Sequence, residues 1–209
     1  YVVRHKDGNW ELETPDLTPD YVLVDYAVVR QAPPHLNAAG MGEAIGHMAV
    51  LAAWRWWAGL GRPGEPWDQS VADDVAGWVR DQVRRFASDT DADGIAGDEA
   101  IRMLAEAQRD RYRLPTFGKD LYHSIDHPFG SAFERVHGRE LIHAEAVALG
   151  TLLTCFVCEW GFDEAKQMLD TCGTRYKPAE IGSTCEEARA AVDAAASGGP
   201  MGPGVNWFS

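Results

Sequence analysis

The chain has 209 residues, 45% of them apolar, which is enough to bury the core of one domain. It carries 19 basic and 32 acidic residues, a net charge of −13, and this acidity argues against broad nucleic-acid binding, which requires basic patches. No apolar run reaches the roughly 18 residues of a membrane span, so we expect no membrane partner.

The first 34 residues are strand-like. Residues 1–5 (YVVRH) and 21–29 (YVLVDYAVV) are rich in β-branched and aromatic side chains, and a charged segment that contains proline is expected to connect them. A chain that opens on a strand, with no visible signal peptide, indicates a start inside a longer gene product or after processing.

From Leu36 onward, nearly every segment has helical periodicity. Apolar spacing and terminal glycines predict helices over residues 35–61, 67–89, 97–112, 127–136, 140–161, 163–173 and 184–199. The most hydrophobic of these, 140–161, is expected to lie at the centre. The sequence therefore predicts a mainly α fold with a short N-terminal β segment, a helical domain over 35–196 and a loosely ordered tail over 197–209.

Two local patterns leave alternatives open. Cys155 and Cys158 form a CxxC in an apolar helical run, which we interpret as buried, reduced thiols because no second CxxC accompanies it. Reduced cysteines favour a cytoplasmic location. Residues 89–100 (DTDADGIAGDEA) resemble an EF-hand loop, but Ala100 stands where a bidentate glutamate is expected, so a polar turn between two helices competes with a calcium site.

A candidate metal site consists of one carboxylate and several histidines. Glu43 and His47 are four residues apart on one predicted helix, so both are expected on the same side. His127 begins a predicted helix, and His143 lies near the start of the central one. A carboxylate with two or three imidazoles is a common ligand set for a first-row divalent metal. The alternative for His143 is a helix-start histidine that hydrogen-bonds a neighbour.

Two longer segments carry a family resemblance. Residues 38–47 (AAGMGEAIGH) and 127–153 (HPFGSAFERVHGRELIHAEAVALGTLL) resemble the C-terminal, metal-binding half of the dehydroquinate synthase / iron-containing alcohol dehydrogenase superfamily. Residues 22–45, 143–153 and 185–195 are similar to the glycerol-1-phosphate dehydrogenase branch of that superfamily. The resemblance covers residues 18–195, which is most of the chain.

The resemblance implies a helical domain whose metal lies in a cleft that faces an N-terminal nucleotide-binding domain. It implies that Glu43, His127 and His143 bind the metal, and that His47 is a fourth ligand or a substrate contact. It also implies that residues 1–34 are the edge of a nucleotide-binding domain that this chain otherwise lacks, since no glycine-rich phosphate-binding turn follows a strand. NAD(P) is then a cofactor only where that domain is supplied upstream or by another chain.

The chain departs from the family pattern at two positions. Ser131 stands where the cyclases and the glycerol-phosphate enzymes carry a second histidine for proton transfer or phosphate contact, so His123 or His137 would have to take that role. Gly46 replaces the lysine that the synthases carry on the glutamate helix, which argues against dehydroquinate synthesis. His47, His123 and Ser131 are therefore the candidate catalytic positions beside the three metal ligands.

Three functions remain open from the sequence. The first is the metal-binding half of a metal-dependent, NAD(P)-linked dehydrogenase of an alcohol or polyol phosphate. The second is a metal-dependent sugar-phosphate cyclase or lyase without net redox change. The third is a non-catalytic helical subunit, or pseudoenzyme, that docks on a partner through an exposed apolar face. The expected metal is zinc, iron, nickel or manganese. The expected partners are a small-molecule substrate and a nucleotide-binding domain or chain, with homo-oligomerisation left open.

Overall fold

The computed structural model describes residues 2–4, 10–12, 23–61, 64–110, 114, 124–138 and 141–196. The tail predicted over 197–209 lies outside the described residues. The domain boundaries proposed after residues 34 and 196 stay predictions.

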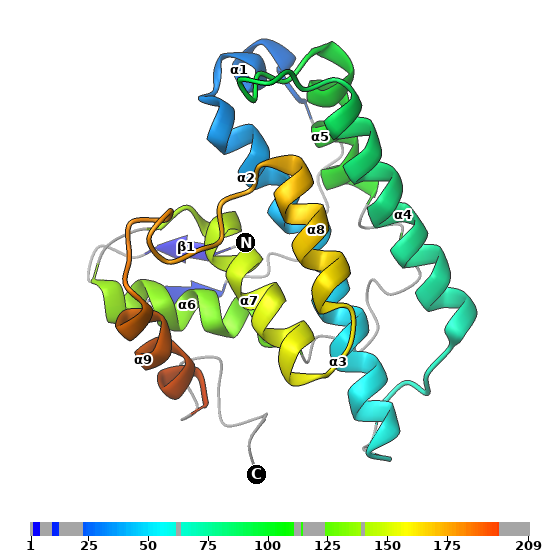
Figure 1. Cartoon of the computed structure of the whole chain (residues 1–209), viewed down its shortest axis with the longest axis vertical. Coiled ribbons are helices and arrows are strands. Elements are labelled where there is room, and N and C mark those ends of the chain that lie inside the picture. Colours follow the sequence, from blue (N-terminus) through cyan, green and yellow to red (C-terminus); the bar gives the residue numbers. More distant parts are fainter. Residues whose placement is uncertain are drawn as a thin grey trace.

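Helices make up most of the described part of the chain, so the predicted mainly α fold is confirmed (Figure 1). The strands β1 (Val2–Arg4) and β2 (Trp10–Leu12) pair antiparallel, and β2 falls in the charged segment that was expected to be a connection. The helices are α1 (Tyr26–Gln31), α2 (Pro34–Ile45), α3 (His47–Gly59), α4 (Gln69–Ser88), α5 (Asp98–Asp110), α6 (Asp126–His137), α7 (His143–Val157), α8 (Phe162–Cys172) and α9 (Cys185–Ala196).

Helix α7 lies at the centre of the helical body, as its hydrophobicity predicted. It contacts α2, α3, α6 and α8 (Figure 1). Its apolar residues enter two cores, a larger one shared with α2, α3, α4, α5 and α8, and a smaller one shared with α6 and α9. Burial of apolar surface in these cores is the main term that stabilises the fold.

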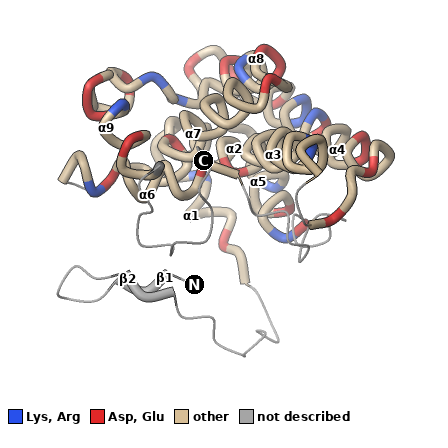
Figure 2. Tube along the Cα trace, turned by 90° about the horizontal axis from the view of Figure 1, so that it is seen from below, with Lys and Arg blue, Asp and Glu red and all other residues tan. Residues whose placement is uncertain are grey.

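Charged residues lie mainly on the helices α4, α5, α8 and α9, whereas α3 and α7 carry few (Figure 2). This distribution agrees with the amphipathic pattern of the outer helices and the apolar composition of the inner ones. Within the described part of the chain, no helix is both long enough and apolar enough to cross a membrane.

Helix α4 shows how the sequence determines an outer helix. Val75 and Val79 recur at helical spacing and are buried in the larger core. The helix begins after Asp68, whose carboxylate accepts hydrogen bonds from the backbone N–H groups of Ser70 and Val71 at 2.9 and 3.2 Å. This is the arrangement of an N-terminal cap, and it places the start of α4 two residues after the predicted start at residue 67.

The strand predicted over residues 21–29 is wrong where the structure describes it. Tyr26 begins α1, and the carboxylate of Asp25 caps that helix by accepting a hydrogen bond from the N–H of Ala27 at 2.8 Å. Val29 packs against the larger core while Val28 is 68% exposed, which is a one-sided helical contact. The cap and this contact outweigh the strand propensity of the β-branched residues.

The single helix predicted over residues 35–61 is divided at Gly46. The N–H of Gly46 donates to the carbonyl oxygen of Gly42 at 2.9 Å and ends α2 there. A Cβ atom at Gly46 would lie 3.2 Å from the carbonyl oxygen of Glu43, so glycine suits this tight turn. The division places Glu43 in the last turn of one helix and His47 at the start of the next.

Two glycines allow neighbouring helices to approach α7 closely. A Cβ atom on Gly42 of α2 would lie 2.5 Å from the carbonyl oxygen of Ala144, and one on Gly150 of α7 would lie 2.6 Å from the Cα of Asp126 in α6. Neither site accepts a larger residue without backbone movement. Each contact lies one residue from a candidate metal ligand, so these two contacts set the geometry of the candidate site.

Helix α7 also contains a buried carboxylate, Glu145, whose side chain is 3% exposed. The guanidinium of Arg175, which follows α8, donates a hydrogen bond to this carboxylate at 2.7 Å. A buried charge needs such a partner, so the ion pair ties the segment after α8 to the start of α7.

Replacing Arg175 with alanine is expected to destabilise the protein by about 2–3 kcal/mol, because it leaves the Glu145 carboxylate buried without its partner. The value lies below the cost of breaking a fully buried pair because the Arg175 side chain is 36% exposed. The urea midpoint measures this loss. Lys177→Ala, which breaks an exposed ion pair with Glu180, is the control and should leave the midpoint unchanged. Equal midpoints for the two variants would contradict the role of Arg175.

Glu187 ties α9 to α6. Its carboxylate accepts a hydrogen bond from the hydroxyl of Ser183 at 2.7 Å and lies 3.0 Å from Nδ1 of His137. The hydrogen bonds from Ser183 and then from His137 lower the pKa of Glu187 from 4.5 to about 2.

The lowered pKa of Glu187 predicts a pH dependence of stability. A carboxyl whose pKa is lower in the folded state stabilises the fold above its unfolded pKa, and this contribution is lost as the pH falls from 4.5 towards about 2. We therefore expect Glu187→Gln to lower the melting temperature at pH 7 and to flatten its dependence on pH over that interval. Thermal melts at a series of pH values test this, and identical slopes for the variant and the wild type would refute it.

Candidate metal centre

Glu43, His127 and His143 meet at one point of the helical body. One carboxylate oxygen of Glu43 lies 3.3 Å from Nε2 of His143, and the other lies 4.0 Å from Nε2 of His127. Ligand atoms of all three residues lie within 4.8 Å of one another. Among the residues that the structure describes, this is the one group of histidine, cysteine and acidic side chains with the geometry of a metal site.

Three helix ends bring this group together from distant parts of the sequence. Glu43 lies in the last turn of α2, His127 lies in the first turn of α6, and His143 is the first residue of α7. Because α7 contacts both other helices, its N-terminus is the common point of the cluster. Nε2 of His143 faces the Glu43 carboxylate, and whether His143 is a metal ligand or a helix-start histidine that pairs with a neighbour stays open.

The donor set fits a divalent cation. A metal ion bonded at about 2.0–2.1 Å to two ligand atoms in tetrahedral geometry separates those atoms by about 3.4 Å. The separation of 3.3 Å between Glu43 and His143 is close to this value, the separation of 4.0 Å between Glu43 and His127 is longer, and all three ligand atoms lie within 4.8 Å of one another. Carboxylate and imidazole donors suit zinc, iron(II), nickel and manganese.

The exposure of the three residues describes an open site. The side chain of Glu43 is 16% exposed, whereas those of His127 and His143 are 51% and 55% exposed. The carboxylate thus lies beneath two imidazoles that face outward. Three protein ligands with open positions for water or substrate are typical of catalytic rather than structural metal sites.

A buried carboxylate that the sequence did not single out lies behind His127. Nδ1 of His127 is 3.2 Å from Oδ2 of Asp126, whose other oxygen accepts a hydrogen bond from the hydroxyl of Ser124. Burial acts to raise the pKa of Asp126, but the hydrogen bonds from His127 and Ser124 outweigh it and hold that pKa below its ordinary value. The helix was predicted only from residue 127 onward, so the sequence pattern gave no sign of this contact.

His47 is not part of the cluster. Its Nδ1 lies 3.2 Å from the carbonyl oxygen of Ala44, and its ring packs edge-on against Trp78 of α4 at a centroid distance of 5.3 Å. Glu43 and His47 lie on two different helices, α2 and α3, and the role of His47 as a fourth ligand or a substrate contact stays a prediction. The geometry gives no support to His47 as a fourth ligand.

The remaining candidate catalytic residues are not gathered at the cluster by any described contact. Ser131 is exposed on α6, one turn after His127. His123 lies outside the described residues. His137, the other candidate substitute for the missing histidine, contacts Glu187 at the opposite end of α6. Roles for Ser131 and His123 stay predictions.

The acidic loop over residues 89–100 is a structured turn between α4 and α5. The carboxylate of Asp89 accepts hydrogen bonds from the N–H groups of Glu99 and Ala100 at 2.8 and 3.0 Å, and so caps the start of α5. Asp91 accepts hydrogen bonds from the N–H groups of two later residues of the loop. Both carboxylates accept hydrogen bonds from backbone N–H groups of the loop, and this favours a polar turn over a calcium site.

The CxxC residues Cys155 and Cys158 are buried free thiols. Burial raises the pKa of each to about 12. Because the thiolate is the form that attacks disulfides and binds metals, neither residue is activated at neutral pH. The prediction of buried, reduced thiols is confirmed.

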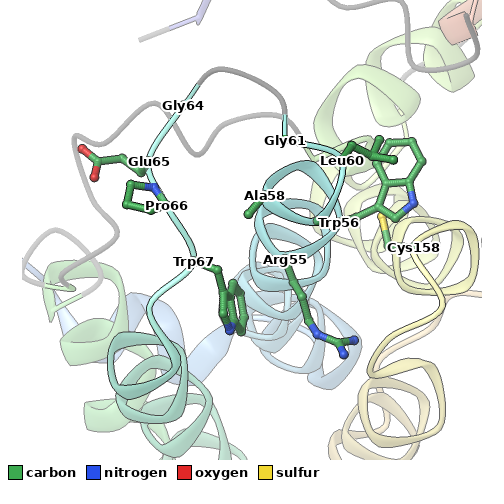
Figure 3. A pocket seen from close by; sticks show the side chains of 11 residues that line it. Arg55, Trp56, Ala58, Leu60, Gly61, Gly64, Glu65, Pro66, Trp67 and Cys158 are labelled. Carbon is green, nitrogen blue, oxygen red and sulfur yellow. The ribbon is translucent and has the colours of Figure 1, made fainter.

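A pocket of about 800 Å³ lies at the C-terminal end of α3, apart from the cluster (Figure 3). Its lining includes Arg55, Trp56, Leu60, Trp67 and Cys158, and none of the three candidate ligands. Half-exposed imidazoles at a helix end do not form a hollow by themselves, so the position of this pocket says little about the metal site. The ionisable side chains of Glu43, His127 and His143 come together at the cluster and not in this pocket.

These observations define a helical domain that presents a carboxylate and two imidazoles from three helix ends. The chain is distantly similar to enzymes of the dehydroquinate synthase / iron-containing alcohol dehydrogenase superfamily, as the sequence motifs indicated. It is 22% identical to glycerol-1-phosphate dehydrogenase [NAD(P)+] of Aeropyrum pernix over 197 residues, and 27% identical to that of Sulfurisphaera tokodaii over 166 residues. It is 28% identical to 3-dehydroquinate synthase of Lactiplantibacillus plantarum over 137 residues. No family model matches the chain.

The three matches cover most of this chain but only part of each relative. The match to the Aeropyrum pernix protein includes 88% of this chain, the match to the Sulfurisphaera tokodaii protein includes 78%, and the match to the Lactiplantibacillus plantarum protein includes 66%. The corresponding shares of the relatives are 51%, 46% and 32%. The chain therefore spans between about a third and about half of the length of these curated relatives.

Proposed function

We propose that the chain is the metal-binding half of a metal-dependent, NAD(P)-linked dehydrogenase that acts on an alcohol or polyol phosphate. The cluster of Glu43, His127 and His143 is the observation that carries this proposal. The two relatives named glycerol-1-phosphate dehydrogenase [NAD(P)+] support both the redox cofactor and the substrate class.

Glu43, His127 and His143 are the residues that would hold the cation. A divalent metal bound there supplies Lewis-acid polarisation of a substrate oxygen. The half-buried Glu43 provides the negative charge of the site, and the outward imidazoles leave access for a small substrate from the solvent side. Ser131 and His123 remain proposed contacts for the substrate.

The nicotinamide cofactor belongs to the other part of the proposed enzyme. We propose that a nucleotide-binding domain, supplied upstream or by another chain, covers the face on which His127 and His143 are exposed. A cytoplasmic location is part of the same proposal and is supported by the buried thiols of Cys155, Cys158 and Cys172.

The experiment measures substrate binding and turnover separately. Calorimetry of the zinc-loaded chain with glycerol 1-phosphate should give binding that is lost after chelation and in Glu43→Gln, because the substrate oxygen needs the bound cation. Addition of the nucleotide-binding polypeptide should then give reduction of NAD(P)+. His35→Ala, which changes an exposed histidine of α2 outside the cluster, is the matched control and should behave as the wild type. Substrate binding that is unaffected by chelation would contradict the proposal.

A second candidate function is a sugar-phosphate cyclase or lyase without net redox change. The match to 3-dehydroquinate synthase favours it. Glycine at position 46, in place of the lysine of the synthases, opposes dehydroquinate synthesis itself. Release of inorganic phosphate without a change in NAD(P)H absorbance would identify this second function.

A further inference from the structure

We propose that Asp126 is a positioning residue for the metal centre, which fixes the tautomer and ring orientation of His127 so that Nε2 faces Glu43. The inference rests on the proposed metal-binding function and assigns a role to a residue outside the ligand set. Nδ1 of His127 lies 3.2 Å from Oδ2 of Asp126, while Nε2 of the same ring lies 4.0 Å from the Glu43 carboxylate. The two nitrogens of one imidazole thus have different partners on opposite edges.

The chemistry of the two partners sets the proton position. A carboxylate only accepts hydrogen bonds, so the contact at 3.2 Å with Asp126 favours the tautomer of a neutral His127 that has its proton on Nδ1. The lone pair is then on Nε2, which is the atom in the cluster. A carboxylate behind a ligand histidine orients the ring and makes it a stronger donor to a metal.

The Asp126 carboxylate is held in place from several sides. Its side chain is 1% exposed, and the hydroxyl of Ser124 donates a hydrogen bond to Oδ1. The backbone of Asp126 lies against α7 at Gly150, where a Cβ atom would be 2.6 Å from the Asp126 Cα. The carboxylate is therefore buried, held by a hydrogen bond and carried on a closely packed backbone segment, which are the properties that a positioning residue needs.

The second imidazole lacks an equivalent support. Among the described residues, the interactions of the His143 side chain are the ion pair with Glu43 and the ring contact with His127. His127 is therefore the pre-oriented ligand, and His143 is the one that adjusts when a metal binds. Loss of Asp126 should make His127 as adjustable as His143 and lower the affinity of the site.

The test compares Asp126→Asn with Ser124→Ala. Asparagine keeps the shape of the side chain and removes its charge, whereas Ser124→Ala removes a hydrogen bond from the same carboxylate but leaves its contact with His127. We expect Asp126→Asn to weaken Co²⁺ binding by about 10–100-fold and to change the visible absorption of the bound Co²⁺, since the ring is reoriented. Ser124→Ala should weaken binding by less than about threefold, although it removes a buried hydrogen bond and lowers the melting temperature.

A second measurement separates this inference from the proposed function. In the metal-free wild type, ¹⁵N NMR of the histidine rings should show the His127 proton on Nδ1, and a proton on Nε2 would overturn the role of Asp126. Co²⁺ affinities of Asp126→Asn and Ser124→Ala that agree within about threefold would also overturn it. A wild-type chain that binds no Co²⁺ overturns the proposed metal function instead, and the NMR result then still decides the tautomer.

Discussion

Glu43→Ala is expected to weaken the binding of Zn²⁺ or Co²⁺ by more than about 100-fold, because a first ligand contributes more than the outer residues whose loss costs about 10–100-fold. The carboxylate of Glu43 lies between the two imidazoles, at 3.3 Å from His143 and 4.0 Å from His127. Without it, two neutral and half-exposed histidines remain, and neither supplies negative charge to the cation. Competition with a chromophoric chelator measures the affinity.

His47→Ala is the control for this experiment. His47 follows Glu43 by four residues, but its ring packs against Trp78 and lies outside the cluster, so the variant should bind the metal as the wild type does. If Glu43→Ala retained the affinity of the wild type, the cluster would not be the metal site. If His47→Ala lost metal as well, His47 would be a ligand after all.

Gly150→Ala is expected to destabilise the protein by about 3 kcal/mol, at the upper end of the cost of overpacking a core. A Cβ atom at this position would lie 2.6 Å from the Cα of Asp126 and 2.7 Å from its carbonyl oxygen, and both are backbone atoms that cannot rotate away. Helix α6 must therefore shift from α7, and His127 moves with it. We expect both a lower urea midpoint and weaker Co²⁺ binding.

Gly77→Ala is the matched control because Gly77 is also in the interior of a helix, α4, but a Cβ atom there meets nothing within 4 Å. Alanine should stabilise the exposed helix by up to about 1 kcal/mol through its higher helix propensity. The two substitutions are chemically identical, so their difference isolates the contact between α6 and α7. A Gly150→Ala variant as stable as the wild type would show that the two helices are not held at this distance.

The helices after residue 66 were predictable because their sequences have one apolar face. In α4, Val75 and Val79 mark the buried side and Asp68 marks the start, so the pattern and the cap agree. The strand predicted over 21–29 failed for the opposite reason. Its β-branched residues indicate a strand locally, while the cap at Asp25 and the packing of Val29 on the larger core are tertiary information.

The three candidate ligands could be predicted from residue type, spacing and family resemblance, and the structure brings them together. The position of His47 on a separate helix could not be predicted, because the helical pattern of the sequence runs through Gly46 and gives no sign that the helix divides there. The support from Asp126 was also out of reach, since its burial results from the packing of α6 on α7 at Gly150. Contacts between segments that are distant in the sequence cannot be predicted from a local sequence pattern.

Elemental mass spectrometry of the purified, untagged chain tests the central claim most directly. The account predicts about one equivalent of zinc, iron, nickel or manganese per chain, lost in Glu43→Ala prepared in parallel. Absence of metal from the wild type after incubation with each of these ions would contradict it. The cluster of Glu43, His127 and His143 would then be an ion pair at a helix start, without metal chemistry.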